Sequence, residues 1–227
     1  MSPTTNDQRR RTKETKDEGR RTKDQGPRTK DTKLLASQST IIAIDFEGTG
    51  VVKGYPDEPW QIGMAKMQNG KLIPGDTLES LIRVGERPFN HYAPGRHAEL
   101  RSEIANAPTM HQIWPNLRSW LEGNLLAAHN AATENRYLSQ AFPLHPPGKW
   151  IDTLKLSRIA FPTIKSHKLE DLLDRLQLTE RLITLLPGRT AHDALYDAIG
   201  CALLLEKILT LPGWENVTTS ALLRARA

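Results

Sequence analysis

A short apolar run that ends in two carboxylates constrains the fold of this chain more than any other feature. Ile41-Ile42-Ala43-Ile44 is followed at once by Asp45 and, two residues on, by Glu47. A run rich in β-branched residues is typical of a buried β-strand, along which side chains alternate between the two faces. Asp45 and Glu47 therefore point to the same side of the strand's end, where their charges repel each other. A divalent cation that prefers oxygen ligands, Mg²⁺ or Mn²⁺, would neutralise them, and two solvated acids are the alternative.

The length and the cysteine content limit the class of protein. A chain of 227 residues can form one domain with a complete core. Its single cysteine, Cys201, excludes an intramolecular disulfide and is typical of a reducing compartment. No segment has the length and hydropathy of a membrane span, and residues 1–33 lack the apolar core of a signal peptide. We therefore expect a cytoplasmic protein that does not associate with membranes.

The formal net charge of +5 belongs to the N-terminal segment. Residues 1–33 contain eleven Lys and Arg against six Asp and Glu, whereas the rest of the chain is balanced. Arg-Thr-Lys recurs at 11–13, 21–23 and 28–30, and large apolar side chains are absent between Met1 and Leu34. Such a segment cannot bury enough apolar surface to repay ordering, so we predict a disordered, basic, low-complexity tail over residues 1–37. It either holds a polyanion in a salt-sensitive way or is simply solvated.

Hydrophobic periodicity after the tail predicts a mixed sheet with helices. Asn69-Gly70 is a strong hairpin turn signal between two of the expected strands, which favours an antiparallel meander at the start. The expected strands are 40–46, 60–67, 77–84, 125–128 and 149–151, and the expected helices are 97–105, 109–122, 130–142, 152–160, 168–177 and 193–210. The segment 213–227 is a C-terminal extension in which a short helix is expected. The pattern indicates an α/β fold.

Two later segments bring further acidic side chains toward the end of the first strand. Glu134 falls one turn inside the helix expected after residues 125–128, and its side chain leans back toward the helix start. Asp197 lies beside the apolar face of the helix expected at 193–210, where an unpaired acid is unfavourable unless a cation neutralises it. His192 precedes that helix on a loop. Asp193 is an alternative ligand to Asp197, with helix capping as its default role.

These segments resemble the three exonuclease motifs of the DEDD superfamily of 3′→5′ exonucleases, in the subtype that has a histidine. The first motif corresponds to Asp-Phe-Glu-Gly-Thr-Gly at 45–50, and the second to the segment 126–138. His192 and Asp197, with four residues between them, match the third. Supporting segments at 60–63, 152–153 and 168–172 occur in the expected order. The resemblance covers about residues 40–210, and the superfamily includes the epsilon subunit of bacterial DNA polymerase III and ribonuclease T.

The resemblance implies a ribonuclease H-like fold, with a mixed five-stranded sheet flanked by helices, in an exonuclease domain at residues 38–212. It implies two divalent ions, Mg²⁺ or Mn²⁺, and assigns their ligands by motif position: Asp45, Glu47, Glu134 and Asp197. His192 would be the general base, and Gly48 and Thr49 would contact the 3′-terminal nucleotide. His129 and Asn130 are further candidates for substrate binding. A structural hydrogen bond is the alternative role for His129, and a helix cap for Asn130.

One departure from the family pattern bears on activity. The family has aspartate where this chain has Glu134, and an aromatic residue where it has Thr133. The extra methylene moves the carboxylate, and Mg²⁺ is strict about ligand geometry. Either the helix shifts, or the second ion binds weakly, or Mn²⁺ is favoured.

The resulting hypothesis is a metal-dependent 3′→5′ exonuclease that releases nucleoside monophosphates from a nucleic acid with a free 3′ end. A DNA polymerase is a candidate partner. The alternatives are a catalytically impaired nucleic-acid-binding or polymerase-accessory module and a phosphodiesterase for small oligonucleotides. Lys165, Lys168 and Arg189 either flank the site and meet phosphates or belong to a solvated surface. No motif distinguishes DNA from RNA.

Overall fold

A five-stranded mixed sheet forms the centre of the molecule. The structure is a computed structural model that describes Met1 and residues 34–225, so most of the predicted tail lies outside the described residues. The strands are β1 (Ile41–Gly48), β2 (Pro59–Gln68), β3 (Lys71–Leu81), β4 (Leu125–Ala128) and β5 (Trp150–Asp152). They lie in the order β3-β2-β1-β4-β5. β1–β2 and β2–β3 pair antiparallel, whereas β1–β4 and β4–β5 pair parallel. The predicted mixed five-stranded α/β sheet is confirmed.

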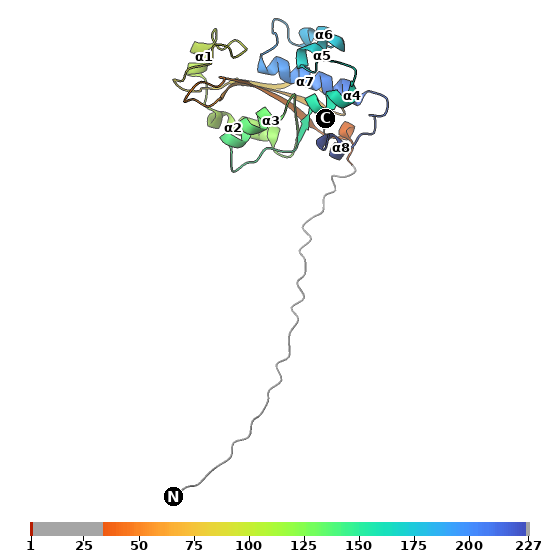
Figure 1. Cartoon of the computed structure of the whole chain (residues 1–227), viewed down its shortest axis with the longest axis horizontal. Coiled ribbons are helices and arrows are strands. Elements are labelled where there is room, and N and C mark those ends of the chain that lie inside the picture. The colour runs from red at the N-terminus through yellow and green to blue at the C-terminus, as the bar shows by residue number, and fades with distance from the viewer. Residues whose placement is uncertain (2–33, 226–227) are drawn as a thin grey trace.

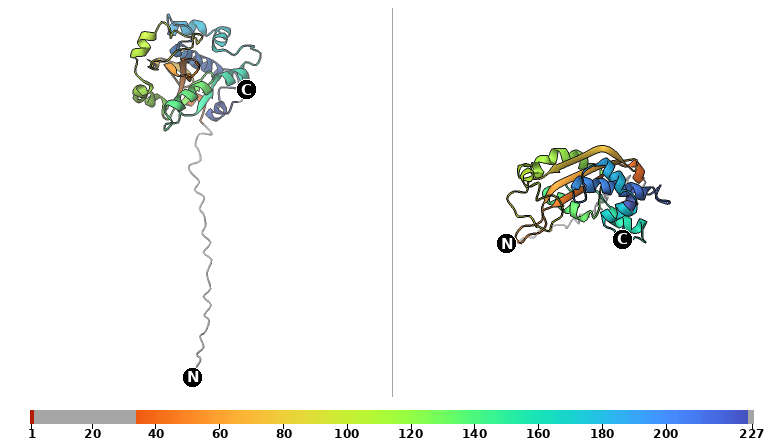
Figure 2. Two further views of the ribbon diagram at one scale, coloured as in Figure 1. Left: turned by 60° about the vertical axis from the view of Figure 1, so that its left-hand side comes forward. Right: turned by 90° about the horizontal axis from the view of Figure 1, so that it is seen from above.

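Helices cover both faces of this sheet (Figure 1). They are α1 (Arg101–Asn106), α2 (Met110–Leu121), α3 (Ala132–Ala141), α4 (Thr153–Ala160), α5 (Leu169–Arg175), α6 (Thr179–Leu185), α7 (Ala194–Leu209) and α8 (Thr219–Leu223). α7 lies on one face together with α4, α5 and α6, and α2 and α3 lie on the other (Figure 1). Two further views show the same layers around the twisted strands (Figure 2).

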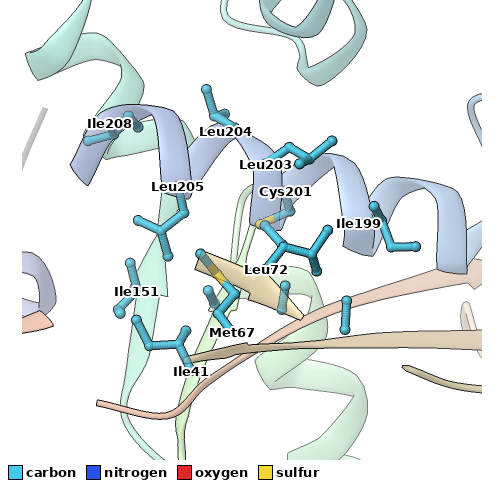
Figure 3. Packing of buried hydrophobic residues seen from close by; sticks show 14 of the residues in the cluster. Ile41, Met67, Leu72, Ile151, Ile199, Cys201, Leu203, Leu204, Leu205 and Ile208 are labelled. Carbon is cyan, nitrogen blue, oxygen red and sulfur yellow. The ribbon is translucent and has the colours of Figure 1, made fainter. Parts of the chain in front are cut away.

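Strand β1 is buried on both of its faces because each face meets a separate hydrophobic core. Ile41 and Ala43 pack into the core around α7, whereas Ile42 and Ile44 pack into the core around α2 and α3. This explains why the sequence of β1 is continuously apolar rather than alternating. In the first core, Figure 3 shows a row of side chains from α7 above residues of the sheet. The fully buried Cys201 lies in that row, and burial raises the pKa of its thiol, so it is an inert packing residue.

A glycine in β2 lets α7 approach the sheet closely. A Cβ atom on Gly63 would lie 2.2 Å from the backbone nitrogen of Leu195 and 2.3 Å from the carbonyl carbon of Ala194. Gly63 also pairs with Asp45 in the antiparallel ladder. The start of α7 is therefore held beside the end of β1, which brings the third motif to the first.

The ends of the described chain differ from the predicted boundaries. The N–H of Ala36 donates to Val217 O at 2.9 Å, and Leu35 forms a bridge with Thr218. Ala36 is 1% exposed in a short 3-10 helix, η2 (Ala36–Gln38). Residues 34–37, assigned to the tail by the sequence, thus pack with the C-terminal segment because Leu35 and Ala36 are apolar. The expected C-terminal short helix is α8.

The turn between β2 and β3 agrees with the sequence prediction, whereas the start of β3, helix α6 and the start of α3 do not. Asn69 and Gly70 form the turn between β2 and β3, both with positive φ, but β3 begins at Lys71 rather than residue 77. Helix α6 was not predicted. Asn130 does not cap α3: its φ is 78°, and the N-cap is Ala131, which makes no side-chain cap bond. Asparagine tolerates the left-handed conformation, so Asn130 forms the tight turn after β4 rather than the N-cap of α3.

Candidate active site

The end of β1 presents two carboxylates side by side, as the strand periodicity predicts. Asp45 stands opposite Gly63 and Glu47 opposite Gln61 in the antiparallel pair with β2. Burial raises the pKa of Asp45 well above its usual range, and the charges of Asp197, Glu134 and Glu47 raise it further. Burial and the charge of Asp197 also raise the pKa of Glu47 to about 8. Both groups are thus held in an environment that disfavours their ionised form.

Glu134 reaches the same region from the first turn of α3. The residue is 4% exposed, and its Oε2 atom has no hydrogen-bond partner among the described residues. Burial raises the pKa of its carboxyl to about 8. A buried carboxylate oxygen without a partner is unfavourable in a folded protein, so this atom is oriented for a ligand that the protein chain does not itself supply.

Asp197 and His192 complete the cluster from the start of α7. Asp197 lies in the first turn of α7, and its Oδ2 accepts the backbone N–H of His192 at 2.9 Å. Burial raises the pKa of Asp197 to about 7, although that hydrogen bond acts in the opposite direction. Glu47, His192 and Asp197 each offer a ligand atom, and these atoms lie within 4.8 Å of one another. Segments far apart in the sequence are therefore brought into one cluster.

The donor set fits hard divalent cations. All four acids offer carboxylate oxygens, which Mg²⁺ and Mn²⁺ prefer, and among the described residues none of the four forms an ion pair with Lys or Arg. The buried Oε2 of Glu134, which has no hydrogen-bond partner among the described residues, is the clearest sign that this donor set fits a cation. A cation would offset both the burial and the mutual repulsion that raise the four pKa values.

A cavity of about 350 Å³ opens beside this cluster. It is lined by Asp45, His129, Lys168, Leu169, Glu170, His192 and Asp197. His192 is exposed, and its Nε2 lies 3.7 Å from Glu170 Oε1. The ring of His192 therefore borders space that a substrate and a water molecule can enter. Lys168 is exposed at the edge of the same cavity, where it can meet a phosphate.

The predicted substrate-binding residues Gly48 and Thr49, at the end of β1, have mainly structural surroundings. A Cβ atom at Gly48 would lie 2.3 Å from Tyr137 Oη and 2.6 Å from Asp57 Oδ1, so packing against these two side chains favours glycine there. The side chain of Thr49 is fully buried, and its hydroxyl accepts the N–H of Glu58 at 3.1 Å. The position of the Thr49 side chain therefore does not favour a contact with a nucleotide.

His129 and Asn130 differ in their accessibility. Nδ1 of His129 lies 3.1 Å from Thr153 Oγ1, and its Nε2 lies 2.8 Å from His167 O. Both ring nitrogens are thus occupied, which favours the structural hydrogen-bonding role for His129, and burial lowers the pKa of its imidazole. Asn130 is exposed, with its side chain at the start of the turn before α3.

Other acids near the site serve as helix caps. Asp152 accepts the N–H groups of Leu154 and Lys155 at the start of α4. Asp193 accepts the N–H of Tyr196 at 3.2 Å and caps α7, which favours its default role over metal ligation. The sequence did not indicate three residues near the site: Glu170, Gly95, and Glu79, which pairs with Arg189.

Gly95 and Glu79 carried no local signal of their proximity to the site. A Cβ atom at Gly95 would lie 2.9 Å from His192 O and 3.4 Å from Glu47 Oε2, so the loop before α1 passes directly over the cluster. Glu79, on β3, pairs with Arg189 across 110 positions of sequence. Glu170 stands in one of the supporting segments of the family resemblance, which is the one signal that could have indicated it.

A family model described as "Exonuclease" matches residues 42–205. Among curated proteins, the chain is 27% identical over 183 residues to a DNA polymerase III subunit epsilon-like protein of Rhodobacter capsulatus, covering 79% of this chain and 25% of that protein. It is 29% identical over 172 residues to exodeoxyribonuclease 10 of Escherichia coli K12, covering 75% of this chain and 69% of that one. The chain spans a quarter or less of the first three curated relatives.

Solved structures share the fold. Exonuclease X in complex with 5′ overhanging duplex DNA aligns with a TM-score of 0.60 and 27% identity, covering 80% of this chain and 96% of that one. The nuclease domain of 3′hExo, described as a DEDDh family member bound to rAMP, aligns with a TM-score of 0.65 and 18% identity, covering 82% and 98%. The second likeness supports the fold only. In the described residues, helices long and apolar enough to cross a membrane are absent.

Proposed function

The chain belongs to the exonuclease family, and on that premise we propose that it is a metal-dependent 3′→5′ exonuclease. Its substrate is a nucleic acid with a free 3′ end, from which it releases nucleoside monophosphates. The observation that carries the proposal is the convergence of four acids from β1, α3 and α7, close enough for the charges of the other three to raise the pKa of Asp45. The buried Oε2 of Glu134, which has no partner among the described residues, supports it.

Asp45, Glu47, Glu134 and Asp197 are the residues that would hold two divalent ions, Mg²⁺ or Mn²⁺. Such ions, when bound, stabilise the charge that builds on the entering and leaving oxygens of a phosphodiester. The burial of Glu134 supports a role for its longer side chain as a ligand, since its carboxylate has no other partner. Glutamate at position 134, where the family has aspartate, is thus compatible with metal binding.

His192 supplies the base. Its ring borders the cavity, so a ring nitrogen can accept the proton of the attacking water. Its backbone N–H donates a hydrogen bond to Asp197 Oδ2, so the base and one of the four acids are directly connected. Glu170 faces the imidazole from α5, with its Oε1 atom 3.7 Å from Nε2. Lys168 at the cavity edge holds the phosphate backbone of the strand.

Incubation with 5′-labelled single strands of DNA and of RNA tests the proposal directly. With Mg²⁺ or Mn²⁺ we expect a ladder of products that shorten stepwise from the 3′ end and the release of mononucleotides. Excess EDTA should abolish the ladder. Retention of the strand without shortening would favour the nucleic-acid-binding module, and turnover of dinucleotides alone would favour the small-oligonucleotide phosphodiesterase.

The partner and the compartment are extensions of this proposal. The likeness to polymerase III epsilon-like and PolC-type proteins makes a DNA polymerase the candidate partner. The single cysteine favours a reducing compartment such as the cytoplasm. Co-purification of the full chain with polymerase subunits from the source organism would test the first of these.

A further inference from the structure

We propose that Arg189 is a positioning residue for His192, because it fastens the loop in front of α7 to β3 through the carboxylates of Asp193 and Glu79. The proposal rests on the proposed function insofar as His192 is the base. We call Arg189, Glu79 and Asp193 the loop clamp. None of its members belongs to the four acids or touches the cavity beside them.

The guanidinium of Arg189 joins two carboxylates at once. Nη1 lies 2.5 Å and Nη2 2.8 Å from the two carboxylate oxygens of Glu79, which is a bidentate ion pair. Nη1 also lies 3.0 and 3.1 Å from the two oxygens of Asp193. Both terminal nitrogens are therefore occupied by carboxylates, which disfavours the phosphate contact considered for Arg189 from the sequence. The residue instead connects a loop to the sheet.

The side chain of Asp193 accepts two further hydrogen bonds. It is 8% exposed, it caps α7 through the N–H of Tyr196, and its Oδ2 accepts from Gln61 Nε2 at 3.2 Å. The other end of the Gln61 amide accepts the N–H of Ala194 at 3.3 Å. Among these contacts Arg189 supplies the positive charge that a buried carboxylate requires. Loss of that charge would leave Asp193 poorly compensated at the residue next to His192.

His192 stands between the loop clamp and the acid cluster. Its φ of 64° lies in the left-handed region, which a non-glycine residue occupies where its surroundings hold it there. On one side its N–H donates to Asp197 Oδ2. On the other side it adjoins Asp193 and follows Arg189 by three positions. The clamp thus holds the strained backbone that points the imidazole at the cavity, although no clamp side chain contacts the ring.

Kinetics of Arg189→Gln test this role, with Arg181→Gln as the matched control. Arg181 forms a similar bidentate pair with Glu206, at 2.8 and 3.2 Å, remote from His192. We expect Arg189→Gln to lower kcat about 10-fold or more, with KM changed less than about 2-fold, since charge-assisted hydrogen bonds of this kind are worth that much. Arg181→Gln should keep kcat. Arg189→Lys, which retains the charge without the fork, should recover part of the loss.

A double-mutant cycle tests whether the effect of Arg189→Gln on kcat depends on His192. In a His192→Ala background, single-turnover rates should be the same with Arg189 and with Gln at position 189, because the residue to be positioned is gone. An undiminished Arg189→Gln effect in that background, or a loss seen in KM rather than kcat, would overturn the proposal.

Amide hydrogen exchange of the full chain tests the clamp without any activity. We expect the His192 N–H to exchange about 10-fold faster in Arg189→Gln, whereas Leu203 in the middle of α7 and the Arg181→Gln protein stay at wild-type rates. Unchanged exchange at His192 overturns the positioning role. A wild-type protein that shortens no strand refutes the exonuclease proposal instead, and the exchange result still decides the clamp.

Discussion

The Glu134 carboxyl shows the conflict within the site at the scale of one residue. It is buried, one of its oxygens has no hydrogen-bond partner among the described residues, and its pKa is raised to about 8. A side chain placed this way reduces the stability of the metal-free fold at neutral pH. Unfavourable placements of this kind are concentrated at functional sites, so the burial of Glu134 supports a functional role.

Replacing Glu134 with glutamine should separate stability from activity. Glu134→Gln keeps the shape and removes the charge, so in EDTA at pH 8 we expect a Tm above that of the wild type, measured by circular dichroism. Strand shortening should fall by about 10²-fold or more, because a ligand is lost. The exposed acid Glu103 provides the control: Glu103→Gln should change neither quantity. A Glu134→Gln protein with full activity would exclude this carboxylate from the ligand set.

His192 allows a second prediction at this scale. The imidazole borders the cavity and makes few contacts, so His192→Ala should leave the Tm nearly unchanged. Loss of a general base lowers kcat by about 10²–10⁴-fold. Single-turnover shortening of a labelled strand measures this, and a decrease smaller than about 3-fold would assign the proton transfer to another group.

At the scale of elements, the close contact between β2 and α7 positions the third motif. Gly63 faces the backbone of Ala194 and Leu195, which cannot yield as a side chain can. Gly200, inside α7, faces the side-chain end of Leu173 at 2.9 Å instead. These two glycines therefore respond differently to the same added methyl group.

We expect Gly63→Ala to reduce the free energy of unfolding by about 2–3 kcal/mol, since the strand and helix must move apart. Gly200→Ala should change it by less than about 1 kcal/mol, because the Leu173 side chain can rotate and alanine favours a helix. Urea denaturation of both variants checks this. If the two variants are equally stable, the backbone contact does not control the separation of β2 and α7.

The elements also show how far sequence patterns reach. The two-residue period of β1 predicted that Asp45 and Glu47 share a side, because pleating alone dictates it. The helix cap at Asp193 could be predicted because its bond to the N–H of Tyr196 is local. The cap at Asn130 was predicted wrongly, because asparagine suits both an N-cap and a left-handed turn, and the path of the chain after β4 required the turn.

At the scale of the whole molecule, the four acids couple stability to pH and metal. Without a cation, the carboxyls of Glu47 and Glu134 have pKa values of about 8 and Asp197 one of about 7, against 4.5 and 3.8 ordinarily. Between those limits the folded protein holds protons that the unfolded chain releases. Stability therefore falls as pH rises from about 4 to 8.

In EDTA we expect a higher Tm at pH 5.5 than at pH 8, measured by calorimetry. Mn²⁺ or Mg²⁺ should raise the Tm more at pH 8, because the ligands must release their protons before they bind metal. Glu134→Gln should flatten the pH dependence in EDTA. A Tm in EDTA that rises between pH 5.5 and 8 would mean that the acids are not held close together without a cation.

The sequence by itself determined the buried strand, its paired carboxylates, the order of the three motifs and the α/β class. These follow from periodicity, local hydrogen bonding and the spacing of residue types, all of which act over a few positions. Only the tertiary structure decided that Glu134 Oε2 has no partner among the described residues, that Thr49 is buried, and that Arg189 pairs with Glu79, 110 positions earlier in the chain. Residues so far apart in the chain come into contact because the strand order and the helix packing bring them together. Sequence patterns extend over only a few positions, so they do not predict such contacts.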